Sequence, residues 1–173
     1  NCTFTNNSAG DGGGMFNNGS SSPTLTNCTF KYNAAEYGGG SFNRNSNSSP
    51  TLSDCEFTRN SASYGGGMYI YDGCCPTLND CTFVNNSAQN YGGGMYNQFK
   101  SAPTLIGCSF TENSAEFGGG MLNQDESSTT ISACIFFNNS VERDGGGMFG
   151  SARGRVCLPL TRVNGQKNQN RPQ

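Results

Sequence analysis

The stretch CTFTNNSAGDGGGMF, residues 2–16, decides the fold because its parts recur along the chain. Its Cys returns five times at intervals of 26 or 27 residues, each time with Phe two positions later and Asn three positions after that Phe. A Gly triplet follows every such Asn, and Met, or once Ser, follows every triplet. The recurring Cys residues are Cys2, Cys28, Cys55, Cys81, Cys108 and Cys134. A fixed period of this kind is the signature of a repeat architecture.

Each repeat is built from runs that are too short for helices. The Cys-x-Phe pair has the period of two that places both side chains on one face of a strand. Gly and Asn disfavour helix and favour turns, so a unit of 26–27 residues is predicted to hold two or three short strands. One unit cannot bury its own Leu, Cys, Phe and Met side chains, whereas units stacked in register can. We therefore predict an all-β fold over residues 1–150, a right-handed single-stranded parallel β-helix of about six coils.

Two side-chain columns are expected inside this β-solenoid. The Cys thiols, one per coil, should point inward and stack as part of the core. The Asn that follows each Phe, from Asn7 to Asn139, should form a ladder of amides bonded to the coils above and below. Because the interior of such a coil is slim, a hydrophobic content of 33% is enough to fill it.

Charge is distributed unevenly along the 173 residues. Residues 1–150 contain 5 basic and 12 acidic residues and therefore carry a net charge of −7. Residues 151–173 contain 5 basic residues and no acid, and we expect this basic polar tail to be poorly ordered. The body shows no cluster of basic and aromatic residues of the kind that binds nucleic acid, so no nucleic-acid partner is expected.

The residue types argue against catalysis. The chain has no His, which excludes an imidazole base, a Ser–His pair and a His metal site. The evenly spread Cys residues are unlike the C-x-x-C pairs of zinc sites, so no catalytic residue, metal or cofactor is expected. The alternative is a polysaccharide-active β-helix, a lyase or glycoside hydrolase, with an acidic cluster of Asp54, Glu56 and Asp80. Asp54 and Asp80 also occupy a turn position that accepts Asn or Asp, which is the competing interpretation.

An aromatic column is the candidate binding surface. The residue after Met is aromatic in most repeats, and alternation turns it outward if Met points inward. An outward stripe of rings could stack on sugars or dock a partner, whereas an inward one would simply be core. The candidate residues are Phe16, Phe42, Tyr69, Tyr96 and Phe149.

The repeats resemble those of the polymorphic outer membrane proteins of chlamydiae and of related bacterial right-handed β-helix proteins. The resemblance rests on Phe-x-x-Asn, as in residues 4–7, followed by Gly-Gly-Gly and an apolar residue, as in residues 12–15, and it covers residues 1–149. It implies an extracellular or cell-surface passenger, often an adhesin, with a host-cell surface protein or glycan as partner. Any membrane contact is expected through parts of a parent protein outside these residues, because the chain starts in mid-repeat at Asn1.

The ends of the predicted column are a further candidate contact surface. A β-helix end exposes the edges of its strands, and exposed edges pair readily with other chains. We therefore expect self-association through the coil ends.

Overall fold

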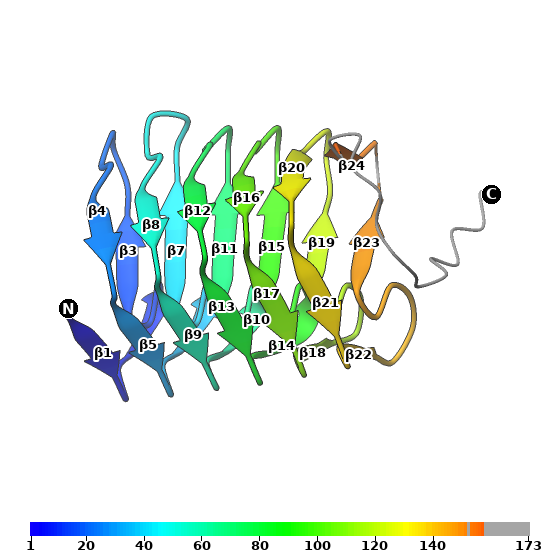
Figure 1. Cartoon of the computed structure of the whole chain (residues 1–173), viewed down its shortest axis with the longest axis horizontal. Helices are drawn as coiled ribbons and strands as arrows, with labels where there is room; N and C mark the ends of the chain where they lie inside the picture. Colours follow the sequence, from blue (N-terminus) through cyan, green and yellow to red (C-terminus); the bar gives the residue numbers. More distant parts are fainter. Residues whose placement is uncertain (152, 158–173) are drawn as a thin grey trace.

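The computed structural model describes residues 1–151 and 153–157, and these form a column of stacked coils with the first and last coils at opposite ends of the column (Figure 1). The strands belong to four parallel sheets that run along the column, named sheets A to D, each with six strands. Among these residues, no helix is long and apolar enough to cross a membrane. The predicted parallel β-solenoid of about six coils is confirmed.

The strands follow one another around each coil in the order A, B, C, D. Sheet A consists of β1 (Thr3–Thr5), β5 (Thr29–Lys31), β9 (Glu56–Thr58), β13 (Thr82–Val84), β17 (Ser109–Thr111) and β21 (Ile135–Phe137). Sheet B consists of β2 (Ser8–Asp11), β6 (Ala34–Tyr37), β10 (Ser61–Tyr64), β14 (Ser87–Tyr91), β18 (Ser114–Ala115) and β22 (Ser140–Val141). Sheet C consists of β3 (Met15–Asn17), β7 (Ser41–Arg44), β11 (Met68–Tyr71), β15 (Met95–Gln98), β19 (Met121–Asn123) and β23 (Met148–Gly150). Sheet D consists of β4 (Thr24–Thr26), β8 (Thr51–Ser53), β12 (Thr77–Asn79), β16 (Thr104–Ile106), β20 (Ser128–Ser132) and β24 (Arg155–Cys157).

A full coil thus contains four strands, and the prediction of two or three was wrong. The run from Leu to Phe in each repeat divides because its middle residue adopts a left-handed backbone conformation, as at Asn27 with φ 51°. A second left-handed residue, such as Asn6 with φ 56°, separates sheet A from sheet B. Asn is among the non-Gly residues that tolerate this region best.

Stacking in register places equivalent side chains on top of one another. Phe30 pairs with Phe57 across β5 and β9, and their rings stack 4.6 Å apart with an interplanar angle of 1°. The Phe, Leu and Met columns form one continuous core together with the thiols of Cys28, Cys55, Cys81 and Cys108, as predicted. The whole interior is therefore built from columns of near-identical residues.

The predicted Asn ladder is present. From Asn7 to Asn113, each Nδ2 donates to the Oδ1 of the Asn one coil further on, at 2.9 to 3.0 Å. Each Oδ1 also accepts the backbone N–H of the previous ladder residue, as Asn86 does from Asn60 at 3.0 Å. From the second coil onward the Nδ2 also donates to the carbonyl of the Phe in the preceding coil. These bonds satisfy polar groups at a corner where the backbone has left the sheet.

The solenoid extends beyond the predicted boundary at residue 150. Strand β24 pairs with β20, with Arg155 opposite Ser128, and the Arg155 N–H donates to the Ser127 carbonyl at 2.8 Å. Sheet pairing requires only backbone groups, which explains how the last strand joins although the side-chain repeat has ended. The expected boundary was therefore too early by at least these residues. The rest of the predicted basic tail, residue 152 and residues 158–173, lies outside the described residues.

Candidate functional site

Sheet C carries the aromatic column on its outer side. Met68, Met95 and Met121 are fully buried in the interior core, and alternation along each strand turns the following residue away from it. The outward residues nevertheless form a second apolar cluster of their own, in which Phe42, Tyr69, Tyr96 and Leu122 are buried.

The candidate binding residues differ in accessibility. Phe16 is 40% exposed and Phe149 is half-buried, whereas Phe42, Tyr69 and Tyr96 are at most 4% exposed. The sequence-based choice between an exposed stripe and a core column missed this third arrangement, a column outside the coil that is covered by other rings.

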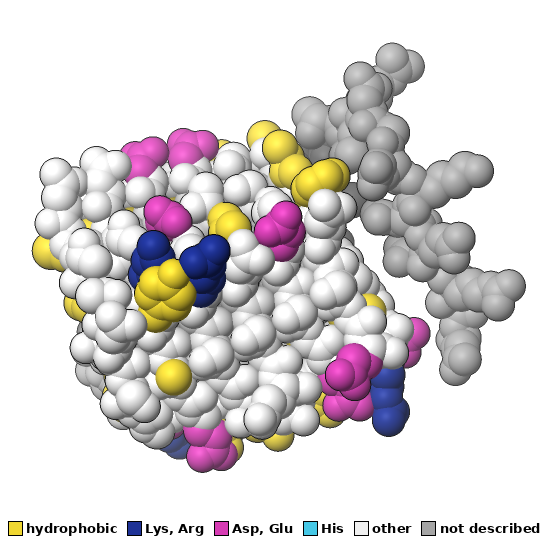
Figure 2. All heavy atoms as spheres, turned by 90° about the horizontal axis from the view of Figure 1, so that it is seen from below, with side chains coloured by type: hydrophobic (Ala, Val, Ile, Leu, Met, Phe, Trp, Pro, Cys, Tyr) yellow, Lys and Arg dark blue, Asp and Glu magenta, His cyan; other side chains and the backbone are white. Residues whose placement is uncertain are grey.

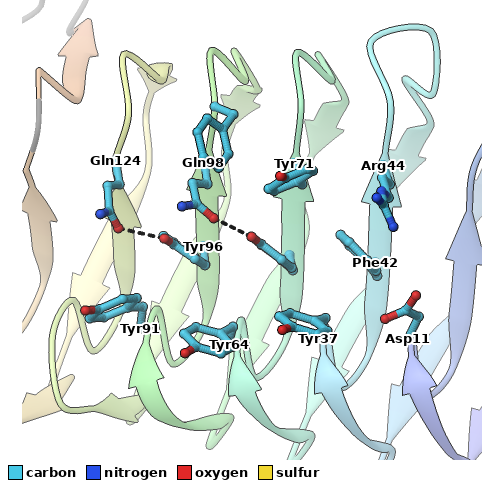
Figure 3. A pocket seen from close by; sticks show the side chains of 12 residues that line it. Asp11, Tyr37, Phe42, Arg44, Tyr64, Tyr71, Tyr91, Tyr96, Gln98 and Gln124 are labelled. Carbon is cyan, nitrogen blue, oxygen red and sulfur yellow. Dashed lines mark hydrogen bonds between the residues drawn. The ribbon is translucent and has the colours of Figure 1, made fainter.

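A second aromatic column covers the first. It consists of the residues directly before the Gly triplets, Tyr37, Tyr64, Tyr91 and Phe117. Its rings approach those of sheet C closely: the ring centroids of Tyr37 and Tyr69 lie 5.9 Å apart, and those of Tyr91 and Tyr96 lie 5.5 Å apart. Figure 3 shows the two columns facing each other from neighbouring strands.

The Gly triplets bring these columns together. The first Gly of a triplet has a left-handed backbone, as at Gly65 with φ 65°. At the second, Gly66, an added Cβ would lie 2.3 Å from the Ser87 carbonyl oxygen, so the chain there packs directly against the next coil. This sharp, tight corner sets sheets B and C at an angle with their outward side chains on the concave side.

The space between the columns is a groove of about 460 Å³ on the outer surface. It falls within the range of roughly 300–1,000 Å³ typical of ligand sites. Six rings of the two columns line it, namely Tyr37, Phe42, Tyr64, Tyr69, Tyr91 and Tyr96. The rest of the lining consists of Asp11, Arg44, Tyr71, Gln98, Phe99 and Gln124.

Amide groups hold the phenol hydroxyls at the floor of this groove. The Tyr96 hydroxyl donates to Gln124 Oε1 at 2.6 Å, and the Tyr69 hydroxyl donates to Gln98 Oε1 (Figure 3). Gln98 Nε2 in turn donates to Asp125 Oδ2 at 2.8 Å. Burial raises the pKa of both Tyr69 and Tyr96, so these phenols stay protonated as hydrogen-bond donors at neutral pH.

Most of the rings are stacked, so that neighbouring rings cover their faces. Tyr69 and Tyr96 are parallel to within 3° at 4.9 Å, and Phe42 stacks on Tyr69 at 4.8 Å. Such rings present edges and hydroxyls to the groove.

Three rings depart from the stacks. Tyr91 is tilted by 56° to 59° against all its aromatic neighbours, and Tyr71 and Phe99 meet at 77°. Phe99 is 46% exposed. These three rings have faces that no parallel ring covers, and they are the groove's platforms for a flat ligand surface.

The acidic residues of the alternative interpretation lie at one corner of the column and on the strand that follows it. Asp54 and Asp80 adopt φ values of 54° and 51° at the corner between sheets D and A, the turn role that was the competing interpretation. The Glu56 carboxylate accepts a hydrogen bond from the Thr58 hydroxyl on the same strand. Among the described residues, no group of three or more His, Cys, Asp or Glu side chains could hold a metal ion.

Cys74 and Cys75, which lie outside the column, have opposite environments. Cys74 is fully buried, and its thiol donates to the Asn45 carbonyl at 2.9 Å. Burial raises the pKa of the Cys74 thiol to about 12. Cys75 is exposed. The structure therefore divides this pair of neighbours into one protected and one accessible thiol.

Part of the groove could have been found from the sequence. The position before the Gly triplet reads Asp11, Tyr37, Tyr64, Tyr91, Phe117 and Asp144, a periodic aromatic signal that sequence reasoning missed. The position of Phe99 is not aromatic in every coil, and the position of Gln98 does not hold an amide in every coil. Neither position therefore gives a repeating signal in the sequence.

The strands, columns and outer groove define a parallel β-solenoid with a ligand-sized aromatic surface. The family model described as "Right handed beta helix region" matches residues 1–92 and 63–158, and the chain belongs to this family. No curated protein and no solved structure matches the chain.

Proposed function

We propose that this chain is a non-enzymatic scaffold of the adhesin or passenger type that binds a linear glycan lengthwise in the aromatic groove. The observation that carries the proposal is the set of three rings that stand outside the parallel stacks, Tyr71, Tyr91 and Phe99, in a groove of about 460 Å³. The guanidinium carbon of Arg44 lies 5.8 Å from the centroid of the Tyr71 ring. Sugar rings combine an apolar face with a rim of hydroxyls. Aromatic faces beside phenol and amide groups complement both parts.

The charge of the groove favours a neutral glycan. Asp11 and Arg44 are the charged residues of its lining, and their charges balance. Residues 1–150 carry 5 basic and 12 acidic residues, so their net charge of −7 repels acidic polymers over the length of the column. We therefore choose a neutral glycan, with a protein partner as the alternative outcome of the test.

The absence of catalysis is part of the proposal. Glycoside hydrolases use a pair of carboxylates on either side of the scissile bond, and Asp11 is the single carboxylate in the groove lining among the described residues. Asp54 and Asp80 are at turn corners in which Asn27 and Gly107 serve equally well, so their position needs no catalytic explanation.

An extracellular or cell-surface location is proposed from the repeat pattern. Phe-x-x-Asn and Gly-Gly-Gly segments resemble those of chlamydial polymorphic outer membrane proteins, and the family match supports the fold on which that resemblance rests. A solenoid suits projection from a surface, because each coil adds about 4.8 Å of length without enlarging the cross-section.

Isothermal titration calorimetry with neutral and acidic oligosaccharides tests the proposal. Tyr71→Ala and Phe99→Ala should each weaken binding roughly fivefold to tenfold, since one aromatic contact contributes about 1 kcal/mol or more. Ile135→Ala is the matched control, because Ile135 is 62% exposed on β21 and does not line the groove. Absence of binding to every glycan, or equal losses in all three variants, would contradict the proposal.

A further inference from the structure

A second surface feature lies at the corner between sheets A and B, far from the groove lining. The left-handed position there is filled by Asn6, Tyr32, Arg59, Asn85, Glu112 and Asn138, with φ between 51° and 56°. Asn adopts this conformation readily, whereas a bulky residue such as Tyr32 rarely does. The fold imposes this conformation in all six coils, so what distinguishes the second and third coils is the pair of large side chains, Tyr32 and Arg59, that they place at the corner.

Lys31 and Arg59 surround the Tyr32 ring. Arg59 Nη1 donates to the Tyr32 hydroxyl at 2.6 Å. Lys31 Nζ lies 5.0 Å from the ring centroid and Arg59 Cζ lies 5.7 Å from it. Figure 2 shows two basic side chains on either side of a hydrophobic one, with an acidic side chain beside them.

The sequence contains no sign of this small cluster, because stacking brings Arg59 beside Tyr32 although the two are 27 positions apart. The cluster is a single small patch and not a track along the column, so it gives no support for nucleic-acid binding.

The two cations have no acidic partner among the described residues. The ion pairs there are Arg143 with Glu116 and Arg153 with Glu126. Glu56, on the strand next to Lys31, instead accepts the hydrogen bond from Thr58. The hydrogen bond from Arg59, aided by the charges of Arg59 and Lys31, lowers the pKa of Tyr32, which shows that the site favours negative charge.

We propose that Lys31, Tyr32 and Arg59 bind a tetrahedral oxyanion, a sulfate or phosphate group carried by a ligand. Arg59 keeps further guanidinium N–H donors beside the one used on Tyr32. The Tyr32 hydroxyl accepts from Arg59 and therefore keeps its own proton to donate, and Lys31 adds an ammonium. Three donors on separate side chains suit the spread oxygens of a tetrahedral anion better than the two coplanar oxygens of a carboxylate.

Side-chain NMR of the full chain tests this site directly. Sodium sulfate and sodium phosphate are titrated separately against sodium chloride at matched ionic strength, with the Tyr32 ring and Lys31 Nζ as reporters. We expect a saturable chemical-shift change with sulfate or phosphate and none with chloride. The anion that binds with the higher affinity shows whether the site prefers a sulfate or a phosphate group on its ligand. The affinity should fall as chloride is added, because the site is exposed. Equal responses to all three salts would overturn the proposal.

Substitutions separate binding from folding. Tyr32→Asn and Arg59→Asn install the residue that three other coils hold at this corner, so both should fold with an unchanged or higher melting temperature. Both should weaken sulfate or phosphate binding by about tenfold or more, read at Lys31 Nζ. Arg143→Gln, which removes a cation already paired with Glu116, is the control and should bind as the unmodified chain does. Undiminished binding in Arg59→Asn would show that the site is not assembled as proposed.

Discussion

Ile70 interrupts a second Asn ladder that runs along sheet C. Asn17 Nδ2 donates to Asn43 Oδ1 at 2.7 Å, and Asn97 Nδ2 donates to Asn123 Oδ1 at 2.8 Å. Ile70 stands between Asn43 and Asn97 in the register. Asn43 Nδ2 and Asn97 Oδ1 are buried without a hydrogen-bond partner among the described residues. One apolar residue thus leaves a donor and an acceptor facing the same position.

Ile70→Asn should be tolerated better than Ile70→Ala, the reverse of the usual order at a buried apolar site. The new amide would pair both orphaned groups, each costing about 1–3 kcal/mol when unpaired, and this offsets the roughly 1.5–3 kcal/mol of lost Ile burial. We expect Ile70→Asn to lie within about 1 kcal/mol of the unmodified chain, and Ile70→Ala to lose about 2–5 kcal/mol. Urea denaturation measures the free energy of unfolding of both variants. A larger loss for Asn than for Ala would contradict the ladder geometry.

Cys74 and Cys75 should differ in reactivity despite being neighbours. Only the thiolate is nucleophilic, and burial raises the pKa of Cys74 to about 12, so its thiol stays protonated at every pH below that value while the chain is folded. Alkylation with iodoacetamide at pH 8, read by mass spectrometry, should label exposed Cys75 and spare Cys74 until urea is added. Labelling of Cys74 in the folded chain would show that the segment around it opens to solvent.

The Gly triplets are a structural requirement of the corner between sheets B and C. At Gly67 an added Cβ would lie 2.5 Å from the Gly94 carbonyl oxygen and 2.8 Å from Phe83 Cδ1. At Gly147, in the last triplet, the nearest such atom is Phe136 Cβ at 3.5 Å. The same residue type at the same corner is therefore packed tightly in one coil and loosely in another.

Gly67→Ala and Gly147→Ala form a matched pair. Gly67→Ala should lose about 3 kcal/mol or more, because backbone and a core ring must both shift. Gly147→Ala should be neutral or stabilising by up to about 1 kcal/mol, since Ala loses less entropy than Gly on folding. Thermal unfolding followed by circular dichroism compares the two. Equal melting temperatures would show that contact with the next coil does not restrict these positions to Gly.

Individual strands show what a repeat can and cannot reveal. The register could be predicted because identical residues such as Phe30 and Phe57 must stack in order to bury their rings. The strand count could not, because the corner at Asn27 lies inside an otherwise strand-like run. Strand β24 was missed because it joins through backbone groups after the side-chain pattern has ended.

The groove was less predictable than the coil. The direction of the column containing Tyr69 followed from alternation, but its burial depends on the angle that the Gly triplet sets between two sheets. Period and composition contain no information on that angle. Tyr71 and Phe99 are candidate ligand contacts because their rings depart from the stacked geometry. A repeating sequence pattern does not predict such a departure.

The column as a whole has open strand edges. In the part of the chain that the structure describes, β1 to β4 and β21 to β24 are the terminal strands of their sheets and pair on one side only. Stacking of one copy on another would continue all four sheets and cover Phe4, which is half-buried in the first coil. Open edges of this kind favour association between copies.

We expect the weight-average mass measured by light scattering to rise with concentration. Phe4→Lys should reduce this rise, because a charge pointing into the end coil opposes stacking. Phe137→Lys, at a 53% exposed side chain on the outer surface of β21, should leave it unchanged. The opposite ranking of these two variants would indicate lateral association through exposed side chains of β21 such as Phe137, and not through the coil ends.

Binding without cleavage is the feature that separates a scaffold from a polysaccharide-active β-helix. One experiment measures both: the chain is incubated with neutral and acidic polysaccharides, with and without Ca²⁺, and its retardation in polysaccharide-containing gels is recorded beside the release of new reducing ends. We predict retardation by at least one neutral glycan, weakened in Tyr71→Ala, with no reducing ends from any substrate. Reducing ends that appear with the unmodified chain and disappear in Asp54→Asn or Asp80→Asn would contradict this account and make the protein an enzyme.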